Sequence, residues 1–131
     1  MAVLSVLIAA IVGFAIGAGW YMALSRPWIR ATGLSVDENG RPVGKPVPYL
    51  FFWTFLCILI VAAMLRHVLD ASAITAPMAG AVAGLGVGLF FIAPWITMNV
   101  LYTMRPVRLA AIDGGYAAVA CAAMGLVLTL F

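Results

Sequence analysis

Four long apolar stretches, separated by shorter polar segments, run along the chain. They extend approximately over Ala2–Leu24, Pro48–Leu65, Ile74–Met104 and Val107–Phe131. Each is close to or above the roughly 20 residues that a helix needs to cross the hydrocarbon core of a bilayer. The pattern predicts an all-α polytopic membrane protein, a four-transmembrane-helix bundle in which residues 1–131 form a single transmembrane domain.

The one long polar segment covers residues 26–47. Asn39-Gly40 is a strong hairpin signal, and Pro42, Pro46 and Pro48 oppose helix formation around it. Just before them, the run from Trp28 to Ala31 is suited to a short interfacial helix. The remaining connections are tight, over residues 66–73 and at the Arg105-Pro106 corner.

Composition removes most alternatives to a membrane protein. The 131 residues are 66% hydrophobic and 8% charged, whereas soluble domains are roughly 45–50% apolar and about 25% charged. The net charge of +3 therefore indicates cationic loops at a membrane, with lipids and not nucleic acid as the partner. Cys57 and Cys121 lie inside apolar runs, and His67 is the single histidine. We expect no cofactor and no metal site.

The loop charges predict an orientation. The first loop carries Arg26, Arg30, Arg41 and Lys45, the third carries Arg105 and Arg108, and the loop between them carries Arg66 alone. Because cationic loops stay in the cytoplasm, both termini are expected to be periplasmic, with residues 26–47 in the cytoplasm.

Small residues at helical spacing indicate where the helices pack. They are Gly13 and Gly17 in the first span and Gly80, Gly84 and Gly88 in the third. Such stripes let helix backbones approach closely in lipid, either inside the bundle, which we favour, or between subunits of an oligomer. In a regular helix the face of Gly88 continues through Trp95, Asn99 and Tyr102. Pro94 predicts a kink on the way.

Asp113 is the most informative polar residue, because an ionisable group inside a span normally faces the bundle interior. Tyr116 follows it on the same face. Folding the last two spans at Arg105-Pro106 brings Asn99 to nearly the same depth. The polar and aromatic residues expected at this depth are Trp20, Tyr21, Tyr49, Trp53, Asn99, Tyr102, Asp113 and Tyr116.

Two simpler interpretations stand beside a functional cluster. Tyr and Trp at one depth often form an interfacial belt, which would account for Trp28, Tyr49 and Trp20. Asp113 would then be structural, paired with Arg26 or Arg30, and we favour that network over a transport or catalytic site. An unpaired Asp113 would instead be protonated near neutral pH.

Several of these residues together resemble the domain of unknown function 1761 family, small bacterial four-helix membrane proteins. The matching pieces are Gly19-Trp20-Tyr21, Trp28, Gly33-Leu34, Asn99-Val-Leu-Tyr102 and Ile112-Asp113-Gly-Gly-Tyr116, with residues 36–48 expected to match least. The resemblance covers nearly the whole chain. It implies the fold and a bacterial inner-membrane location, marks Trp20, Asn99, Asp113 and Tyr116 as signature residues, and implies no activity.

Three classes of function remain open. The glycine stripes and short loops favour an accessory or scaffolding protein that packs against itself or a larger membrane complex. The alternative is a small oligomeric transporter or channel that uses Asp113 and Asn99. The third is a membrane enzyme or lipid-binding protein with an aromatic pocket. Because the sequence has no Ser/His/Asp set, paired carboxylates or phosphate loop, we expect that it is not an enzyme.

Overall fold

The computed structural model describes residues 2–131 and consists of helices joined by short loops. The order along the chain is α1 (Ala2–Ala23), α2 (Ser25–Thr32), α3 (Val47–Ala71), α4 (Pro77–Val87), a π-helical turn η1 (Gly88–Ile92), α5 (Ala93–Tyr102) and α6 (Val107–Leu128). Because α4, η1 and α5 form one continuous rod, four helices are long and apolar enough to cross a membrane. The predicted four-helix architecture is confirmed.

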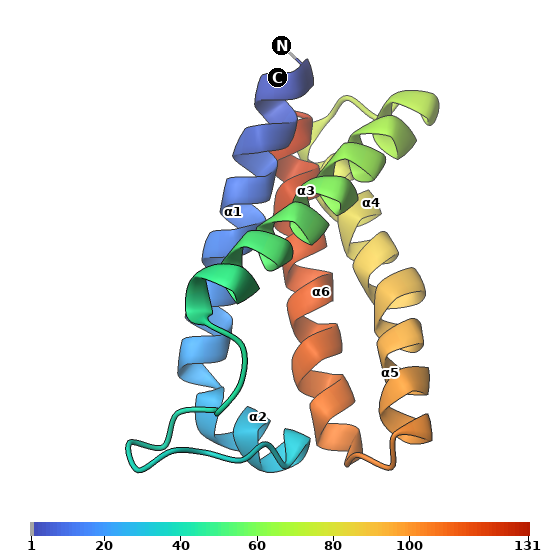
Figure 1. Ribbon diagram of the computed structural model, residues 1–131. Helices are drawn as coiled ribbons and strands as arrows, with labels where there is room; N and C mark the ends of the chain where they lie inside the picture. The colour runs from blue at the N-terminus through green and yellow to red at the C-terminus, as the bar shows by residue number, and fades with distance from the viewer. Residues whose placement is uncertain (1) are drawn as a thin grey trace.

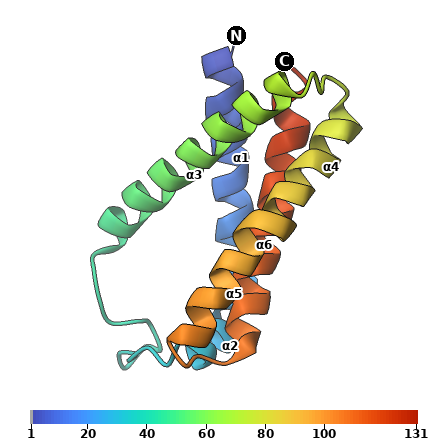
Figure 2. The same ribbon diagram turned by 90° about the vertical axis from the view of Figure 1, so that its right-hand side faces the viewer.

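The central helix is α6, which lies between α1 on one side and the α4–α5 rod on the other (Figure 1). Half of its most apolar window is buried inside the bundle, against 6% for α3. The two termini lie at one end of the bundle and α2 lies at the other (Figures 1 and 2). The α2 end also holds the first loop and the α5–α6 corner. We call it the basic end, because these segments carry six of the seven Lys and Arg residues.

Helix α3 crosses the bundle obliquely and touches it mainly through its second half. Its buried residues are Ala62, Leu65 and Leu69, whereas its first turns stand away from α5 (Figure 2). The helix continues past the predicted end at Leu65 to Ala71, and this places Arg66 and Asp70 one turn apart, where they pair at 3.0 Å. Arg66 also donates to the backbone oxygen of Leu128 at 2.7 Å, which ties α3 to the end of α6.

The glycines of the third span pack against α6, inside the bundle. A methyl group added to Gly84 would meet the backbone oxygen of Cys121, and one added to Gly80 or Gly88 would likewise meet a backbone oxygen of α6. In α1, Gly13 lies against Met124 and Gly17 against the Tyr116 ring. The small residues therefore permit backbone contact on both sides of α6.

The π-helical turn changes which residues after Gly88 face the bundle interior. Ala93 donates to the oxygen of Gly88, five residues back, and Pro94 has no N–H to donate. Because a π turn holds one extra residue, the inward face passes to Ile96 and Val100. The prediction that Trp95, Asn99 and Tyr102 share the glycine face is therefore wrong; all three are exposed, Tyr102 by 85%.

The first loop forms a short hairpin at its tip. Val36 pairs with Pro42 across it, and the Asp37 carboxylate accepts from the backbone N–H groups of Asn39 and Arg41, both at 2.9 Å. Gly40 has a φ of 74°, which glycine adopts without strain. The predicted Asn39-Gly40 turn is therefore present.

Candidate functional site

Asp113 joins three helices near the basic end. Its Oδ1 atom accepts from the Tyr21 hydroxyl at 2.7 Å and from Trp28 Nε1 at 3.1 Å. Tyr21 is on α1, Trp28 on α2 and Asp113 on α6. The helical conformation is interrupted at Leu24, which has φ −107° and ψ 18°. Helix α2 therefore runs in a new direction after α1, and the Trp28 indole reaches this carboxylate.

Two further bonds fasten α1 to α6 beside Asp113. Trp20 Nε1 donates to the Ile112 oxygen at 3.0 Å, and the Tyr116 hydroxyl donates to the Gly13 oxygen at 3.0 Å. The Tyr21 ring packs edge-on against the rings of Trp28 and Tyr116, with centroids 5.8 Å and 5.4 Å away. In the membrane interior such polar groups need protein partners, and these bonds provide them.

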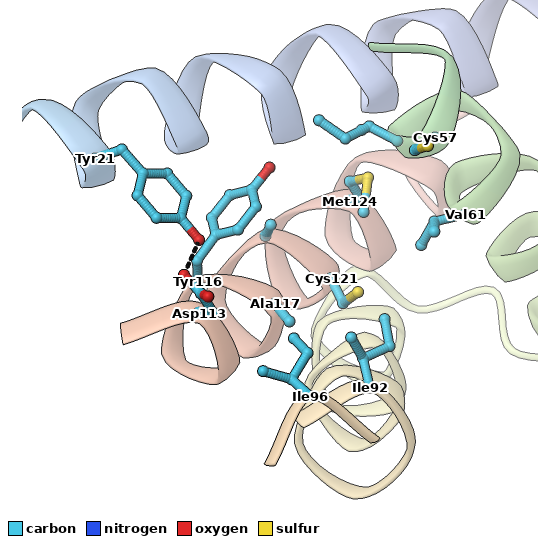
Figure 3. Close-up of a pocket in the computed structure, with 12 residues that line it drawn as sticks. Tyr21, Cys57, Val61, Ile92, Ile96, Asp113, Tyr116, Ala117, Cys121 and Met124 are labelled. Carbon is cyan, nitrogen blue, oxygen red and sulfur yellow. Dashed lines mark hydrogen bonds between the residues drawn. The ribbon is translucent and has the colours of Figure 1, made fainter. Parts of the chain in front are cut away.

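A cavity of about 320 Å³ begins at this cluster and continues between α1, α3, α6 and the rod formed by η1 and α5. Tyr21, Asp113 and Tyr116 form its polar end (Figure 3). The rest of its wall is apolar or carries a thiol: Cys57, Ile58, Val61, Ile92, Ile96, Ala117, Ala120, Cys121 and Met124. On the α3 side, whose first half leans away from α5, the cavity is lined by the exposed Cys57 and the half-buried Ile58 and Val61.

One oxygen of Asp113 has no hydrogen-bond partner. Both side-chain hydrogen bonds to Asp113 end on Oδ1. Within residues 2–131, no buried side-chain oxygen or nitrogen lacks a partner. Since Oδ2 has no hydrogen bond, it must keep accessible surface, and Asp113 lines the cavity.

The expected arginine partners do not reach Asp113. Arg26 and Arg30 are exposed, and the ion pair that residues 2–131 contain joins Arg66 to Asp70 at the opposite end of the bundle. The expectation of an Asp113–arginine pair is therefore corrected: the donors are a phenol and an indole. Position on α2 decides this, because Trp28 faces α6 while Arg26 and Arg30 face outward.

The structure brings together four of the cluster residues expected from the sequence, namely Trp20, Tyr21, Asp113 and Tyr116. It leaves Asn99 and Tyr102 on the outer face of α5 because of the π turn. Trp53 is 48% exposed because the first half of α3 leans outward, and Tyr49 stacks beneath the Lys45 ammonium, 5.7 Å from the ring centroid.

Trp28 was interpreted as an interfacial residue, yet it belongs to the cluster. The signal in the sequence is Pro27, since proline is tolerated in the first turn of a helix and here lies in the first turn of α2, which begins at Ser25. The cavity-lining residues of α3 gave no signal, because Cys57, Ile58 and Val61 look like ordinary residues of an apolar span.

Four helices of spanning length, of which α6 is the central one, with a polar cluster between them, define a small multi-pass membrane protein. Residues 4–129 match the family described as "Protein of unknown function (DUF1761)", so the chain belongs to that family, as its residues indicated. No curated protein and no solved structure matches the chain. The family description assigns no function, so any functional argument rests on the site itself.

Proposed function

We propose that this protein binds an amphipathic small molecule within the membrane, in the cavity that ends at Asp113. The observation that carries the proposal is an apolar cavity with a single carboxylate at one end. Sites for small molecules are mostly apolar with a few converging polar groups, and range over about 300–1,000 Å³. A volume of about 320 Å³ suits one short amphiphile.

The position of the cavity supports entry from the lipid. Its α3 wall includes the exposed Cys57, and α3 packs on the bundle only from Ala62 onward. A ligand with an apolar body can therefore pass beside the first half of α3 without crossing a polar surface. The proposal keeps the binding step of the transporter alternative and makes no statement about transport. Tyr21 and Tyr116, and not Asn99, are the polar residues beside Asp113.

Binding is tested by filling the cavity. Ala120 is 3% exposed and lines the cavity, whereas its neighbour Val119 is 43% exposed on the outer face of the same helix. Native mass spectrometry of the purified protein should show a retained small amphiphile in the wild type and in Val119→Leu, and much less of it in Ala120→Leu. Equal retention in both variants, or none in the wild type, would overturn the proposal.

A second candidate is the accessory role, in which α3 packs against a second copy of the chain. The observation that favours it is an exposed stripe on α3 at helical spacing, formed by Trp53, Cys57, Ile60 and Met64. Two such stripes in contact would place the two Cys57 thiols near each other. Mild oxidation in liposomes should then give a covalent dimer that Cys57→Ser abolishes and Cys121→Ser does not. A wild type that stays monomeric under oxidation would indicate that the stripe faces lipid.

We also propose that the protein lies in a bacterial inner membrane with both termini periplasmic. The support is charge: six of the seven basic residues lie in the first and third loops or at their edges, and these loops share the basic end (Figure 1). A C-terminal reporter that is active only in the periplasm should work, and one active only in the cytoplasm should be silent. The reverse result would invert the topology.

A further inference from the structure

We propose that the ligand of this cavity is a cation, an alkyl ammonium whose charged head pairs with Asp113 and whose chain lies along α6. The inference rests on the proposed function and deepens it, because it names the chemical class of the ligand. It follows from what surrounds the carboxylate, from the rings beside it, and from the shape of the cavity beyond.

Charge balance at Asp113 favours a cationic ligand. A carboxylate inside a span needs a compensating cation or hydrogen bonds to both oxygens. Here two neutral donors bind Oδ1, Oδ2 keeps accessible surface, and the Asp113 side chain lines the cavity. No ion pair with Asp113 exists among residues 2–131, and the nearest arginines along the chain from Trp28 are exposed. An ionised Asp113 is therefore half of an ion pair, which a cation bound in the cavity would complete.

Two tyrosine rings at the same end of the cavity also favour a cation. Tyr21 and Tyr116 line the cavity beside Asp113, with ring centroids 5.4 Å apart and the planes inclined at 68°. Aromatic faces attract ammonium groups through the ring quadrupole, and more strongly where water is excluded. The hydroxyl of Tyr116 is held by the Gly13 oxygen, so this ring stays in place whether or not a ligand is bound.

The length and the apolar walls of the cavity beyond Asp113 indicate what the rest of the ligand is like. From Asp113 the cavity follows α6 to Met124, eleven residues on, which is about 16 Å of helix rise. Apart from the polar end, its walls are aliphatic, sulfur-bearing or alanine side chains. A molecule that fills it has one charged end and an unbranched or slim apolar body. A fatty acid has the right shape and the wrong charge, because its carboxylate would meet Asp113.

The experiment compares three probes that share one chain and differ in the head: octylammonium, octanol and octanoate, at equal concentrations and neutral pH in detergent micelles. Ligand binding to the folded state raises the melting temperature. We expect the largest rise with octylammonium, a smaller one with octanol and the smallest with octanoate. A charged hydrogen-bonded contact should favour the ammonium over the alcohol by about tenfold or more in affinity.

Asp113→Asn is the specific variant, because its amide oxygen can still accept from Tyr21 and Trp28 while the charge is gone. In this variant octylammonium should raise the melting temperature no more than octanol does. Comparing the variant with the wild type in the same probe also removes any effect of the probe on the micelle. Ala120→Leu keeps the carboxylate and fills the cavity, so it should lose the response to both probes. If Asp113→Asn does not fold, the wild type tests the charge: octylammonium must raise its melting temperature more than octanol does, by a margin that is absent in Ala120→Leu.

Two outcomes would contradict these ideas, and they differ. If octanol stabilises the wild type as much as octylammonium does, and Ala120→Leu abolishes both effects, the cavity binds ligands and the cation inference is wrong. If Ala120→Leu responds to every probe as the wild type does, the cavity is not a binding site and the proposed function fails as well.

Discussion

Replacing Gly84 by alanine tests the close approach of α4 to α6. A methyl group there would meet the backbone oxygen and carbon of Cys121 and the Cα of Ala122. Backbone atoms cannot rotate aside as a side chain can, so α4 and α6 must separate. Gly86, one half-turn further along the same helix, has nothing within 4 Å of such a methyl group, and Gly86→Ala is therefore the matched control.

The magnitude follows from what the separation removes. Overpacking alone typically costs about 1–3 kcal/mol. Gly80 and Gly88 approach the α6 carbonyl oxygens of Gly125 and Ala117 in the same way, and weakening two such Cα–H···O contacts costs roughly 0.5–1 kcal/mol each. The sum predicts a loss of about 2–5 kcal/mol for Gly84→Ala. Gly86→Ala should gain up to about 1 kcal/mol, because alanine is the better helix former.

The assay is reversible unfolding in mixed micelles, with sodium dodecyl sulfate as denaturant and circular dichroism as the signal. Both variants lose one glycine and gain one methyl group, so only the position differs. Stabilities for the two variants within about 0.5 kcal/mol of each other, which is the usual range for surface substitutions, would show that α4 does not lie against α6 as described. A change of oligomeric state with unchanged unfolding would instead place the stripe between subunits.

Two further residues are tested by the same unfolding assay, and a third by hydrogen exchange. Asp113→Ala leaves the half-buried donors of Tyr21 and Trp28 without an acceptor, at roughly 1–3 kcal/mol each. It should therefore destabilise at least twice as much as Asp113→Asn; equal losses would mean that those bonds contribute little. Tyr116→Phe removes the bond to the Gly13 oxygen and should lower stability by about 0.5–1.5 kcal/mol, and a neutral result would contradict it. Arg66→Ala frees the Leu128 oxygen, so hydrogen exchange should quicken in the last turn of α6, with unchanged exchange counting against that contact.

The spans and their number could be predicted because they depend on length and hydropathy alone, which the sequence states directly. The depth of Asp113 and its closeness to Trp20, Tyr21 and Tyr116 could also be predicted, since helical rise fixes depth once the corners are known. The hairpin at Asn39-Gly40 follows from local turn chemistry.

The rest depends on small departures from regular geometry. One extra residue in the turn before Pro94 carries Asn99 from the inner face to the outer one, and no periodicity in the sequence marks where a π turn will form. The direction of α2 places Trp28, not an arginine, at Asp113. The tilt of α3, which opens the cavity and exposes Trp53, is set by packing at its far end around Leu65 and Leu69. Because this tilt could not be predicted, the sequence alone favoured an accessory packing role over a binding role.

The hydrogen bonds between α1 and α6 also bear on how the protein is assembled. They join residues 92 and 103 positions apart in the chain, so Trp20, Tyr21 and the Gly13 oxygen enter the membrane long before their partners are synthesised. Until then the Trp20 and Tyr21 donors must find partners in water, headgroups or the insertion machinery. When α6 follows, the Tyr21 hydroxyl is already in the membrane as a donor for the Asp113 carboxylate, and this lowers the penalty of bringing Asp113 into the bilayer. The order of synthesis therefore makes α1 part of the surface against which α6 is inserted.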